Sequence, residues 1–498
     1  MADLGWLALV GLAAWNLGDA ALVRLRVAQA STKGANALVV GLALLSYLCL
    51  ALGGLEMLRP WLLRALIIGL AIWGLLRARS GIRLPRQRPL CPRPLAAALA
   101  ALLATGVLLS LLAALDPPTP LDLTHYHLRG PIFWLEHGRV AWPFRDLPYH
   151  YPQGMEILFA LGLAVGSTRM PQLLHFLAAL ATLWGVMSFA QARWGRKVAL
   201  LAGLFYWTVP EVYYLATIPF VDLAWTGAEV LAVLAFAEGL KISAPRDRLR
   251  QWALVGALAG WAAAVKYAAL WTVLLLGIGV AWTEAARCAG RGEWMRHVLP
   301  AIAAYAAPTL AFAAFWYGKN WLCFGNPVYP FLWGGRGLAF EDAQRWTEFL
   351  RLFGPSRTIW RFLQLPWDIF MTQRIPSMQP GIFPYPIALV PLLVAYRRWE
   401  RTATLFLAFS LAYLTAWYWT GTQQLRFVLT PMALACLLAA RSGGAILCRK
   451  GFLVTVAGGL LVAALLLSLV LQWQALAGHI LPGALPQGTP ILELWRGW

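Results

Sequence analysis

Apolar residues along this chain occur in long unbroken runs rather than in alternation with polar residues. The runs are about 16 to 22 residues long, which is the length that an α-helix needs to cross a bilayer. Strands of an outer-membrane barrel would alternate apolar and polar positions instead. The pattern therefore predicts an all-α polytopic membrane protein with about fourteen transmembrane helices, within a range of 12–14.

The helices are predicted near residues 4–23, 36–57, 61–76, 94–115, 171–191, 198–217, 222–240, 252–265, 268–285, 297–317, 384–396, 402–420, 424–440 and 451–472.

Two stretches of the chain do not fit this pattern of single spanning helices. The apolar segment 155–165 is too short to span, so we expect it at the membrane surface or dipping into the membrane. The region 252–285 fits either one long helix with Lys266 in its middle or a hairpin of two helices. In a hairpin, the first arm is about 21 Å long, which is short of the roughly 30 Å hydrocarbon core.

The charge distribution selects the hairpin. Lys and Arg number 41 against 21 Asp and Glu, a net charge of +20. The basic residues gather in short segments, 24–33, 77–93, 193–197, 241–250, 287–296, 397–401 and 441–450. Cytoplasmic loops of membrane proteins carry such an excess, and the hairpin puts all seven segments on that side. The N-terminus and Lys266 then lie outside. A nucleic-acid-binding protein would concentrate its charge on one domain, so no nucleic-acid partner is expected.

Composition excludes several other classes. Hydrophobic residues make up 60% of the chain and charged residues 12%, with a mean hydropathy of +0.64. A soluble enzyme or a disordered chain would carry about twice that share of charge. Six cysteines without a CxxC pair give neither a disulfide framework nor a zinc site. The first apolar run has no preceding basic residue, so we interpret it as a retained helix rather than a signal peptide.

The predicted membrane topology divides the chain into four regions. Residues 1–93 hold three N-terminal helices and an arginine-rich cytoplasmic loop, and residues 94–318 form the membrane core with a first outer loop at 116–156. Residues 319–383 form a second large outer loop, and residues 384–498 hold the last helices and an outer tail. Both outer loops are expected to bear short helices.

The first outer loop concentrates side chains that can do acid–base or metal chemistry. They are Asp122, His125, His127, Asp146, His150 and Glu156. Asp122, His125 and His127 are close enough in sequence to act as metal ligands or as an acid–base pair. A solvated surface loop can also hold polar residues without any such role.

Further charged residues lie at or near the predicted outer ends of helices. Asp222 begins one helix, and Glu229 follows seven residues later on the same helical face. A carboxylate inside a span normally faces a polar cavity or a partner, although Glu229 also fits a structural ion pair or a protonated acid. Three cations, Lys266, Lys319 and Arg426, are also outer. They either extend to the interface as amphipathic side chains or bind a lipid-linked phosphate.

Outer carboxylates combined with outer cations are typical of a transferase that uses a lipid-phosphate-linked donor. A carboxylate would take the proton of an acceptor hydroxyl, and the cations would stabilise the phosphate leaving group. Because nucleotide donors do not cross the membrane, an outward-facing site implies a lipid-carried donor.

Several segments resemble a known family in the same order along the chain. DLTHYHLRGPIFWLEHG and PQGMEILFALGL resemble the first outer loop of bacterial GT-C glycosyltransferases, related to protein O-mannosyltransferases and to the aminoarabinose transferase of lipid A. VDLA at Asp222, GALAGWAAAVKYAAL at Lys266, KNWLCFGNPVYPF at Lys319 and QLRFVLTPMALACLLAA at Arg426 follow. The resemblance covers residues 94–440 and does not include the three N-terminal helices.

The resemblance implies a site and its partners. It implies Asp122 as the catalytic acidic residue, Asp222 as the second outer acidic position, and Lys266 or Arg426 as the phosphate-contacting cation. His127, Lys319, Tyr126 and Gln424 complete the expected binding set, with His125, His150, Glu156 and Glu229 as secondary candidates. A divalent Mg or Mn ion would lie on Asp122 and Asp222. Many members have an adjacent acidic pair, but Leu123 follows Asp122 here, so metal use stays open.

The resemblance also implies the reaction and the location. The expected function is inverting transfer of a hexosyl or pentosyl group from a polyprenyl-phosphate carrier to a hydroxyl acceptor on a glycan, lipid or protein. The expected location is the bacterial inner membrane, with the site on the periplasmic face and membrane lipid as a partner.

Two alternatives remain from the residues themselves. An O-antigen polymerase or ligase would act through arginines of the second outer loop, which are Arg336, Arg345, Arg351, Arg357, Arg361 and Arg374. A secondary transporter or flippase would use Glu229 as a proton or ion site. The absence of an internal sequence repeat argues against the transporter.

Overall fold

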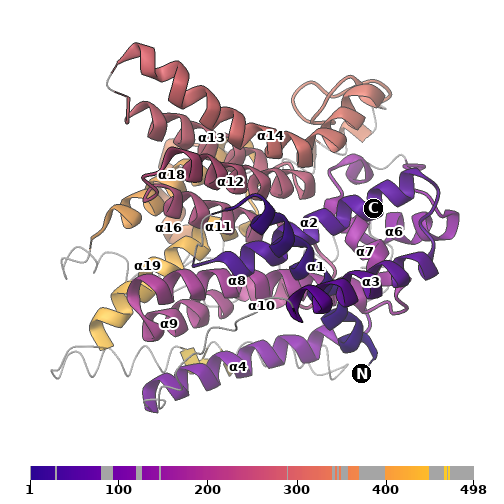
Figure 1. Cartoon of the computed structure of the whole chain (residues 1–498), viewed down its shortest axis with the longest axis horizontal. Coiled ribbons are helices and arrows are strands. Elements are labelled where there is room, and N and C mark those ends of the chain that lie inside the picture. Colours follow the sequence, from indigo (N-terminus) through magenta and orange to yellow (C-terminus); the bar gives the residue numbers. More distant parts are fainter. Residues whose placement is uncertain are drawn as a thin grey trace.

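The computed structural model describes residues 2–27, 31–79, 94–118, 126–144, 147–288, 290–338, 342–344, 347–348, 357–369, 399–447, 465–467 and 469–470. Within these ranges the chain is helical and contains no strand (Figure 1). The elements are α1 (Ala2–Arg24), α2 (Lys33–Gly54), α3 (Pro60–Arg79), α4 (Pro94–Ala114), α6 (Tyr126–His137), η1 (Leu147–His150), α7 (Gly154–Ala164), α8 (Met170–Trp194), α9 (Arg196–Trp207), α10 (Pro210–Leu215), α11 (Asp222–Gly239), α12 (Pro245–Val265), α13 (Ala269–Ala285), α14 (Arg291–Phe324), α16 (Ile359–Trp367), α18 (Arg401–Thr420), η4 (Leu425–Val428) and α19 (Leu429–Leu447).

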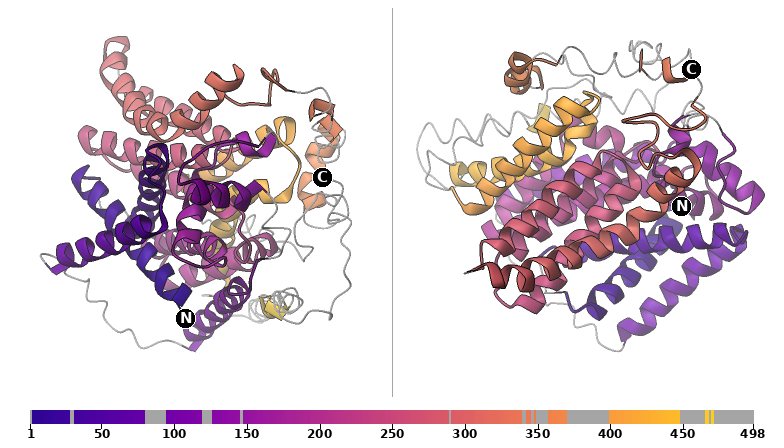
Figure 2. Two further views of the ribbon diagram at one scale, coloured as in Figure 1. Left: turned by 90° about the vertical axis from the view of Figure 1, so that its right-hand side faces the viewer. Right: turned by 90° about the horizontal axis from the view of Figure 1, so that it is seen from above.

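The helices make this a multi-pass membrane protein. Seven helices in the described residues are long and apolar enough to cross a bilayer, namely α1, α2, α3, α4, α8, α14 and the segment Leu425–Gly444, which comprises η4 and most of α19. The long helices of the core run in a common direction, as the right-hand view of Figure 2 shows. The expected helix at 384–396 and most of that at 451–472 lie outside the described residues, so fourteen spans remain a prediction.

The predicted helix boundaries need three corrections. The helix expected at 198–217 is two helices, α9 and α10, because the chain breaks before Pro210, whose ring cannot continue a helix. The helix α12 begins at Pro245 rather than 252 and has 21 residues, which gives about 31 Å, so the expected short arm was wrong. The helix expected at 424–440 begins as the short 3₁₀ turn η4.

The hairpin prediction is confirmed. The helices α12 and α13 are separate, and Lys266 lies in the turn between them with an extended backbone, at φ −153° and ψ 140°.

The described parts of the basic segments gather at one end of the bundle, which we call the basic end. Lys33 and Arg77 both form salt bridges with Asp19. The backbone N–H of Ser31 donates to Glu238, and Arg287 donates to the carbonyl oxygen of Leu240, two residues further along the chain. Arg193, Trp194 and Arg441 meet the segment that begins α18, with Trp194 and Arg441 donating to Glu400. This clustering is what the charge pattern predicted, since each of these segments was assigned to the same side.

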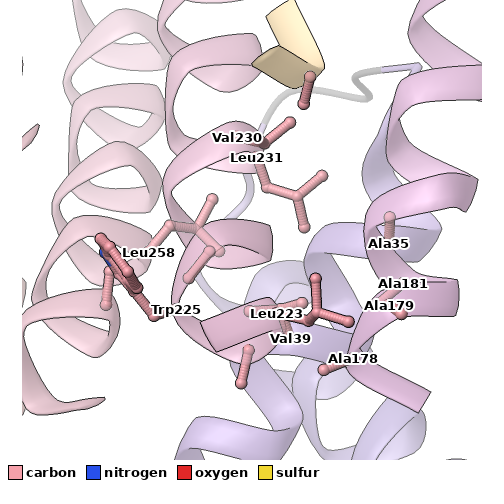
Figure 3. Packing of buried hydrophobic residues seen from close by; sticks show 14 of the residues in the cluster. Ala35, Val39, Ala178, Ala179, Ala181, Leu223, Trp225, Val230, Leu231 and Leu258 are labelled. Atoms are coloured by element: carbon pink, nitrogen blue, oxygen red, sulfur yellow. The ribbon is translucent and has the colours of Figure 1, made fainter. Parts of the chain in front are cut away.

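The core is built around α11. Every residue of α11 except Glu238 is buried, and its side chains pack toward small residues of α2 and α8 such as Ala35 and Ala178 (Figure 3). The neighbouring helices α12 and α14 are also closely packed. A Cβ atom on Gly256 would lie 2.0 Å from the Tyr305 carbonyl oxygen, and one on Gly260 would lie 2.6 Å from Thr309 Cα. Small residues spaced by four allow this approach, which is how helices associate tightly in lipid.

Candidate functional site

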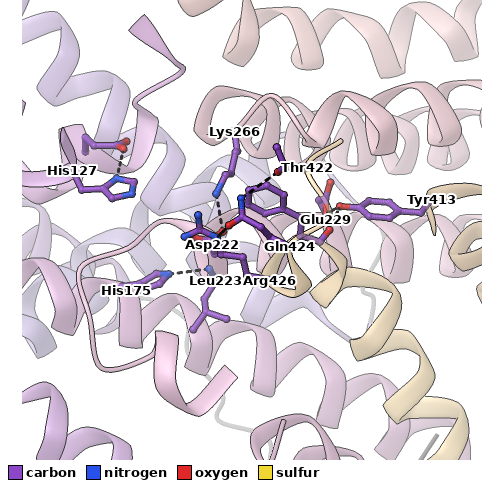
Figure 4. Close-up of polar contacts among 12 residues, drawn as sticks. His127, His175, Asp222, Leu223, Glu229, Lys266, Tyr413, Thr422, Gln424 and Arg426 are labelled. Atoms are coloured by element: carbon purple, nitrogen blue, oxygen red, sulfur yellow. Dashed lines mark hydrogen bonds and ion pairs between the residues drawn. The ribbon is translucent and has the colours of Figure 1, made fainter. Parts of the chain in front are cut away.

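Three charged side chains meet at the end of the bundle opposite the basic end, which we call the site end (Figure 4). Lys266 Nζ donates to Asp222 Oδ1 at 2.7 Å, and Arg426 Nη1 lies 3.9 Å from Asp222 Oδ2. The side chain of Asp222 is fully buried, and those of Lys266 and Arg426 are 17% and 11% exposed. We call these three residues the charged cluster. The structure thus brings together three residues that are far apart in the sequence and were predicted separately.

The start of α11 positions Asp222. Its neighbour Leu223 donates its backbone N–H to His175 Nε2 at 2.9 Å, and His175 Nδ1 donates to the Ile218 carbonyl oxygen at 2.9 Å. An imidazole that accepts at one nitrogen and donates at the other is neutral. His175 therefore supplies a partner for one of the backbone N–H groups that a helix start leaves unpaired, and it holds the loop before α11 at the same time.

Aromatic rings hold the two cations. The ring of Phe427 lies 4.3 Å from Lys266 Nζ and 5.2 Å from Arg426 Cζ, measured to its centroid. Lys266 also lies 5.3 Å from the Trp225 ring. Such contacts stabilise a cation that has left water. Gln424 Oε1 accepts from Arg426 Nε at 3.0 Å, so this predicted binding residue orients the guanidinium.

The charge of the cluster is unbalanced. Two cations share one carboxylate, and the contact of Arg426 with that carboxylate is long. Among the described residues no other carboxylate lies within 4 Å of Lys266 or Arg426. Within the described residues the cluster therefore keeps a net positive charge that an anionic ligand would neutralise, and phosphate is one of the anions that Lys and Arg bind.

His127 and Glu156 form a second buried pair in the region of the charged cluster. His127 Nδ1 and Glu156 Oε1 are 2.8 Å apart, and both side chains are less than 5% exposed. Glu156 belongs to α7, which at 11 residues is too short to span. Burial raises the pKa of Glu156 to about 8, while burial and then Lys266 lower the pKa of His127 well below its usual value. Near neutral pH the two groups thus share one hydrogen bond between neutral forms.

Glu229 lies apart from the charged cluster. Its carboxyl oxygens accept from the hydroxyls of Thr272 and Thr430, and Tyr413 OH lies at 3.4 Å. These partners come from α13, α19 and α18, so this secondary candidate joins four helices in the core. All of its described contacts are with neutral groups.

Lys319 and His150 meet outside the charged cluster. Lys319 Nζ donates to the His150 carbonyl oxygen at 3.2 Å, and Asn320 Nδ2 donates to the same oxygen at 2.8 Å. Burial and then Lys319 lower the pKa of His150 to about 4, so its ring is neutral at pH 7. The structure thus separates the predicted outer cations into two places.

Several predicted residues fall outside what can be placed. Asp122 and His125 lie outside the described residues, and Tyr126 begins α6 without a described side chain. Of the arginines behind the polymerase alternative, Arg345, Arg351 and Arg374 are likewise outside. Arg357 donates to the carbonyl oxygens of Trp419 and Gly421, which ties the residues before α16 to the end of α18.

His175 is the site residue that the sequence prediction missed. It lies in the apolar run MPQLLHFLAAL of a spanning helix. An ionisable residue inside a span is a functional candidate by default, and this signal could have identified it.

The divalent metal expected on Asp122 and Asp222 remains a prediction, because Asp122 lies outside the described residues. No group of three or more His, Cys, Asp or Glu side chains in the described part of the chain could hold a metal ion. Asp222 Oδ1 already accepts from Lys266, and Arg426 faces Oδ2. Two cations beside a single carboxylate repel a third, so we derive no step through a metal.

Comparison with known proteins gives only distant similarity. No protein-family model matches the chain, and no curated protein matches it. One similar solved structure is the archaeal oligosaccharyltransferase AglB from Archaeoglobus fulgidus in complex with an inhibitory peptide and a dolichol-phosphate, with a TM-score of 0.45 and 13% identity. Another is the apo form of the Archaeoglobus fulgidus oligosaccharyltransferase, with a TM-score of 0.44 and 14% identity.

Each alignment covers 80% of this chain and 59% of the other. Similarity at this distance establishes neither a family nor an activity.

Proposed function

We propose that this protein is an inverting glycosyltransferase of the GT-C type that takes its sugar from a polyprenyl-phosphate carrier. The observation that carries the proposal is the charged cluster, in which two buried cations share one carboxylate at the end of the bundle opposite the basic end. A cluster of this charge in the membrane is costly unless it serves a ligand. A lipid phosphate fits it, because the lipid tail stays in the bilayer while the phosphate reaches Lys266 and Arg426.

The reaction would be a direct displacement at the anomeric carbon. The acceptor hydroxyl oxygen attacks that carbon, the carbon–oxygen bond to phosphate breaks, and polyprenyl phosphate leaves with the electron pair. Lys266 and Arg426 would stabilise the negative charge that develops on the leaving phosphate. A carboxylate would take the proton of the hydroxyl, and we assign this role to Asp122 from the sequence resemblance.

Asp222 would act beside the phosphate rather than on the acceptor. Its hydrogen bond to Lys266 holds the ammonium in place. His175 and Gln424 would position the cluster through the start of α11 and the guanidinium of Arg426. The bacterial inner membrane, a periplasmic site and a glycan, lipid or protein acceptor belong to the same proposal.

The test is binding of a polyprenyl monophosphate to the purified full-length protein. Arg426→Gln should weaken binding about tenfold or more, because it removes a charge-assisted contact with the phosphate. Arg139→Gln is a matched control, since Arg139 is an exposed outer-loop cation that is 53% exposed and contacts Glu56. Equal affinity of wild type, Arg426→Gln and Lys266→Met would contradict the phosphate assignment.

The role of Asp122 needs a separate assay. Mass spectrometry of envelope glycans should show one sugar missing in cells that carry Asp122→Asn, while the purified variant still binds polyprenyl phosphate. Full transfer by this variant would exclude Asp122 as the base.

A further inference from the structure

Lys319 is a cation that has no anionic partner in the described part of the chain. Its ammonium group donates to the His150 carbonyl oxygen and lies 4.6 Å and 5.8 Å from the ring centroids of Trp142 and Trp316. Among the described residues no carboxylate lies within 4 Å of it. An ammonium has three N–H donors, and the described residues accept from one of them here. By contrast, Arg248 and Arg441 at the basic end each bind a carboxylate.

The groups around Lys319 are held in place by their own bonds. Trp142 Nε1 donates to Gln153 Oε1 at 2.8 Å, and Trp316 is fully buried. Asn320 is also fully buried, and its amide donates both to the His150 carbonyl oxygen and to Tyr267 OH. The position of the ammonium is therefore set by three segments, α14, the first outer loop and the turn after α12.

Lys319 lies next to an exposed apolar part of α14. The residues that follow on α14, Trp321 and Leu322, are 57% and 79% exposed, whereas Trp316 and Asn320 on the same helix are buried. Exposed apolar side chains on a spanning helix face lipid tails. A ligand that reaches Lys319 from this side has a lipid tail on one part and a charged group on the other.

The same place is linked to the charged cluster without being part of it. Tyr267 directly follows Lys266, and Asn320 directly follows Lys319, so the hydrogen bond between Tyr267 and Asn320 connects the two cations through their neighbours. The proposed transfer reaction needs only one phosphate position, and the charged cluster supplies it. Lys319 is a second positive position at the same end of the bundle.

We propose that Lys319, backed by Trp142 and Trp316, is a second anion site that binds the phosphate group of a lipid other than the sugar donor. The phosphate would accept from the remaining N–H donors of Lys319, and the lipid tail would lie along the exposed face of α14. The lipid is either the acceptor substrate or a phospholipid of the membrane, and both carry the chemistry that the site recognises.

The test uses dioleoyl phosphatidic acid as the probe, with native mass spectrometry of the full-length protein in detergent saturated with polyprenyl monophosphate. Wild type should bind one phosphatidic acid in addition, and Lys319→Met should weaken this binding about tenfold or more. Lys319→Arg should retain most of this binding, because it keeps the positive charge. The loss in Lys319→Met can then be assigned to the missing charge rather than to misfolding. Arg139→Gln should bind as wild type does.

Three results would overturn the proposal. They are equal affinity of wild type and Lys319→Met, equal binding of uncharged dioleoylglycerol, and binding of inorganic phosphate alone at Lys319. Loss of the phosphatidic acid in Arg426→Gln would also overturn it, because the two positions would then be one site.

Two further arms separate the sources and the two proposals. Equal affinity for phosphatidylglycerol, a phosphodiester, identifies a membrane phospholipid, whereas a preference for the monoester phosphatidic acid identifies a substrate phosphate. The two proposals can also fail separately. If polyprenyl phosphate does not bind but phosphatidic acid binding still depends on Lys319, the proposed function is wrong and the second anion site is supported.

Discussion

Two buried carboxylates lie at opposite ends of the bundle, and their surroundings differ. At the basic end, Glu284 accepts from Arg248 Nε and Nη2 at 2.5 and 2.8 Å and from Trp252 Nε1 at 2.9 Å. One carboxylate and one guanidinium balance each other there in a bidentate pair. At the site end, Asp222 faces two cations and makes only one short contact. The comparison indicates that the first arrangement is complete by itself, whereas the second leaves positive charge for a ligand.

Substitution of Asp222 should have the largest effect on activity. Asp222→Asn removes the only carboxylate beside Lys266 and Arg426 among the described residues. Polyprenyl monophosphate should bind at least as tightly, since both cations remain, but transfer should fall on the order of 100-fold because Lys266 loses its charged partner. Binding and single-turnover transfer, measured on the same purified variant, separate the effect on affinity from the effect on the reaction. A parallel loss of both would mean that Asp222 only maintains the fold.

Substitution at the basic end should affect stability and leave binding unchanged. Arg248→Met strands the buried carboxylate of Glu284, which should cost about 3–5 kcal/mol. The double variant Arg248→Met/Glu284→Gln should recover most of that loss, because the uncompensated charge is gone. Thermal unfolding in detergent measures the stability, and polyprenyl phosphate affinity serves as the second readout. A changed affinity in the double variant would contradict the division between the two ends.

Acid pH should lower the stability of the folded protein through His150 at the site end, and this effect should be smaller. The pKa of His150 is lowered to about 4 in the folded protein, below the 6.5 of an exposed histidine. The unfolded chain therefore binds more protons between pH 6.5 and 4, so stability present above pH 6.5 is lost as the pH falls to 4. The loss should be up to about 3 kcal/mol. In His150→Gln, the melting temperature should depend less on pH over this range. An unchanged dependence on pH would exclude His150 as the cause.

Much of the architecture could be predicted from the sequence because lipid imposes simple rules. The run lengths located the helices, and the basic segments predicted both the hairpin at Lys266 and the clustering at one end. The break between α9 and α10 was missed, although Pro210 carried the signal. The start of α12 was misplaced because its first turns, from Pro245, are polar and lie outside the apolar run.

The candidate site was predicted as residues but not as an arrangement. Asp222, Lys266 and Arg426 were each singled out, yet nothing in one sequence shows that Phe427 lies beside both cations or that Gln424 orients Arg426. Distances between segments depend on helix packing, which periodicity does not encode. The separation of Lys319 from the charged cluster was unforeseen for the same reason.

The close approach of α12 and α14 has a consequence for substrate choice. Lys266 follows the last residue of α12, and Lys319 lies on α14, while Gly256 and Gly260 let the two backbones meet without an intervening side chain. Helices joined in this way do not slide or separate easily. The backbones that carry the two lysines are therefore held at a fixed spacing, and two lipid phosphates bound by them would be kept apart by the fold itself.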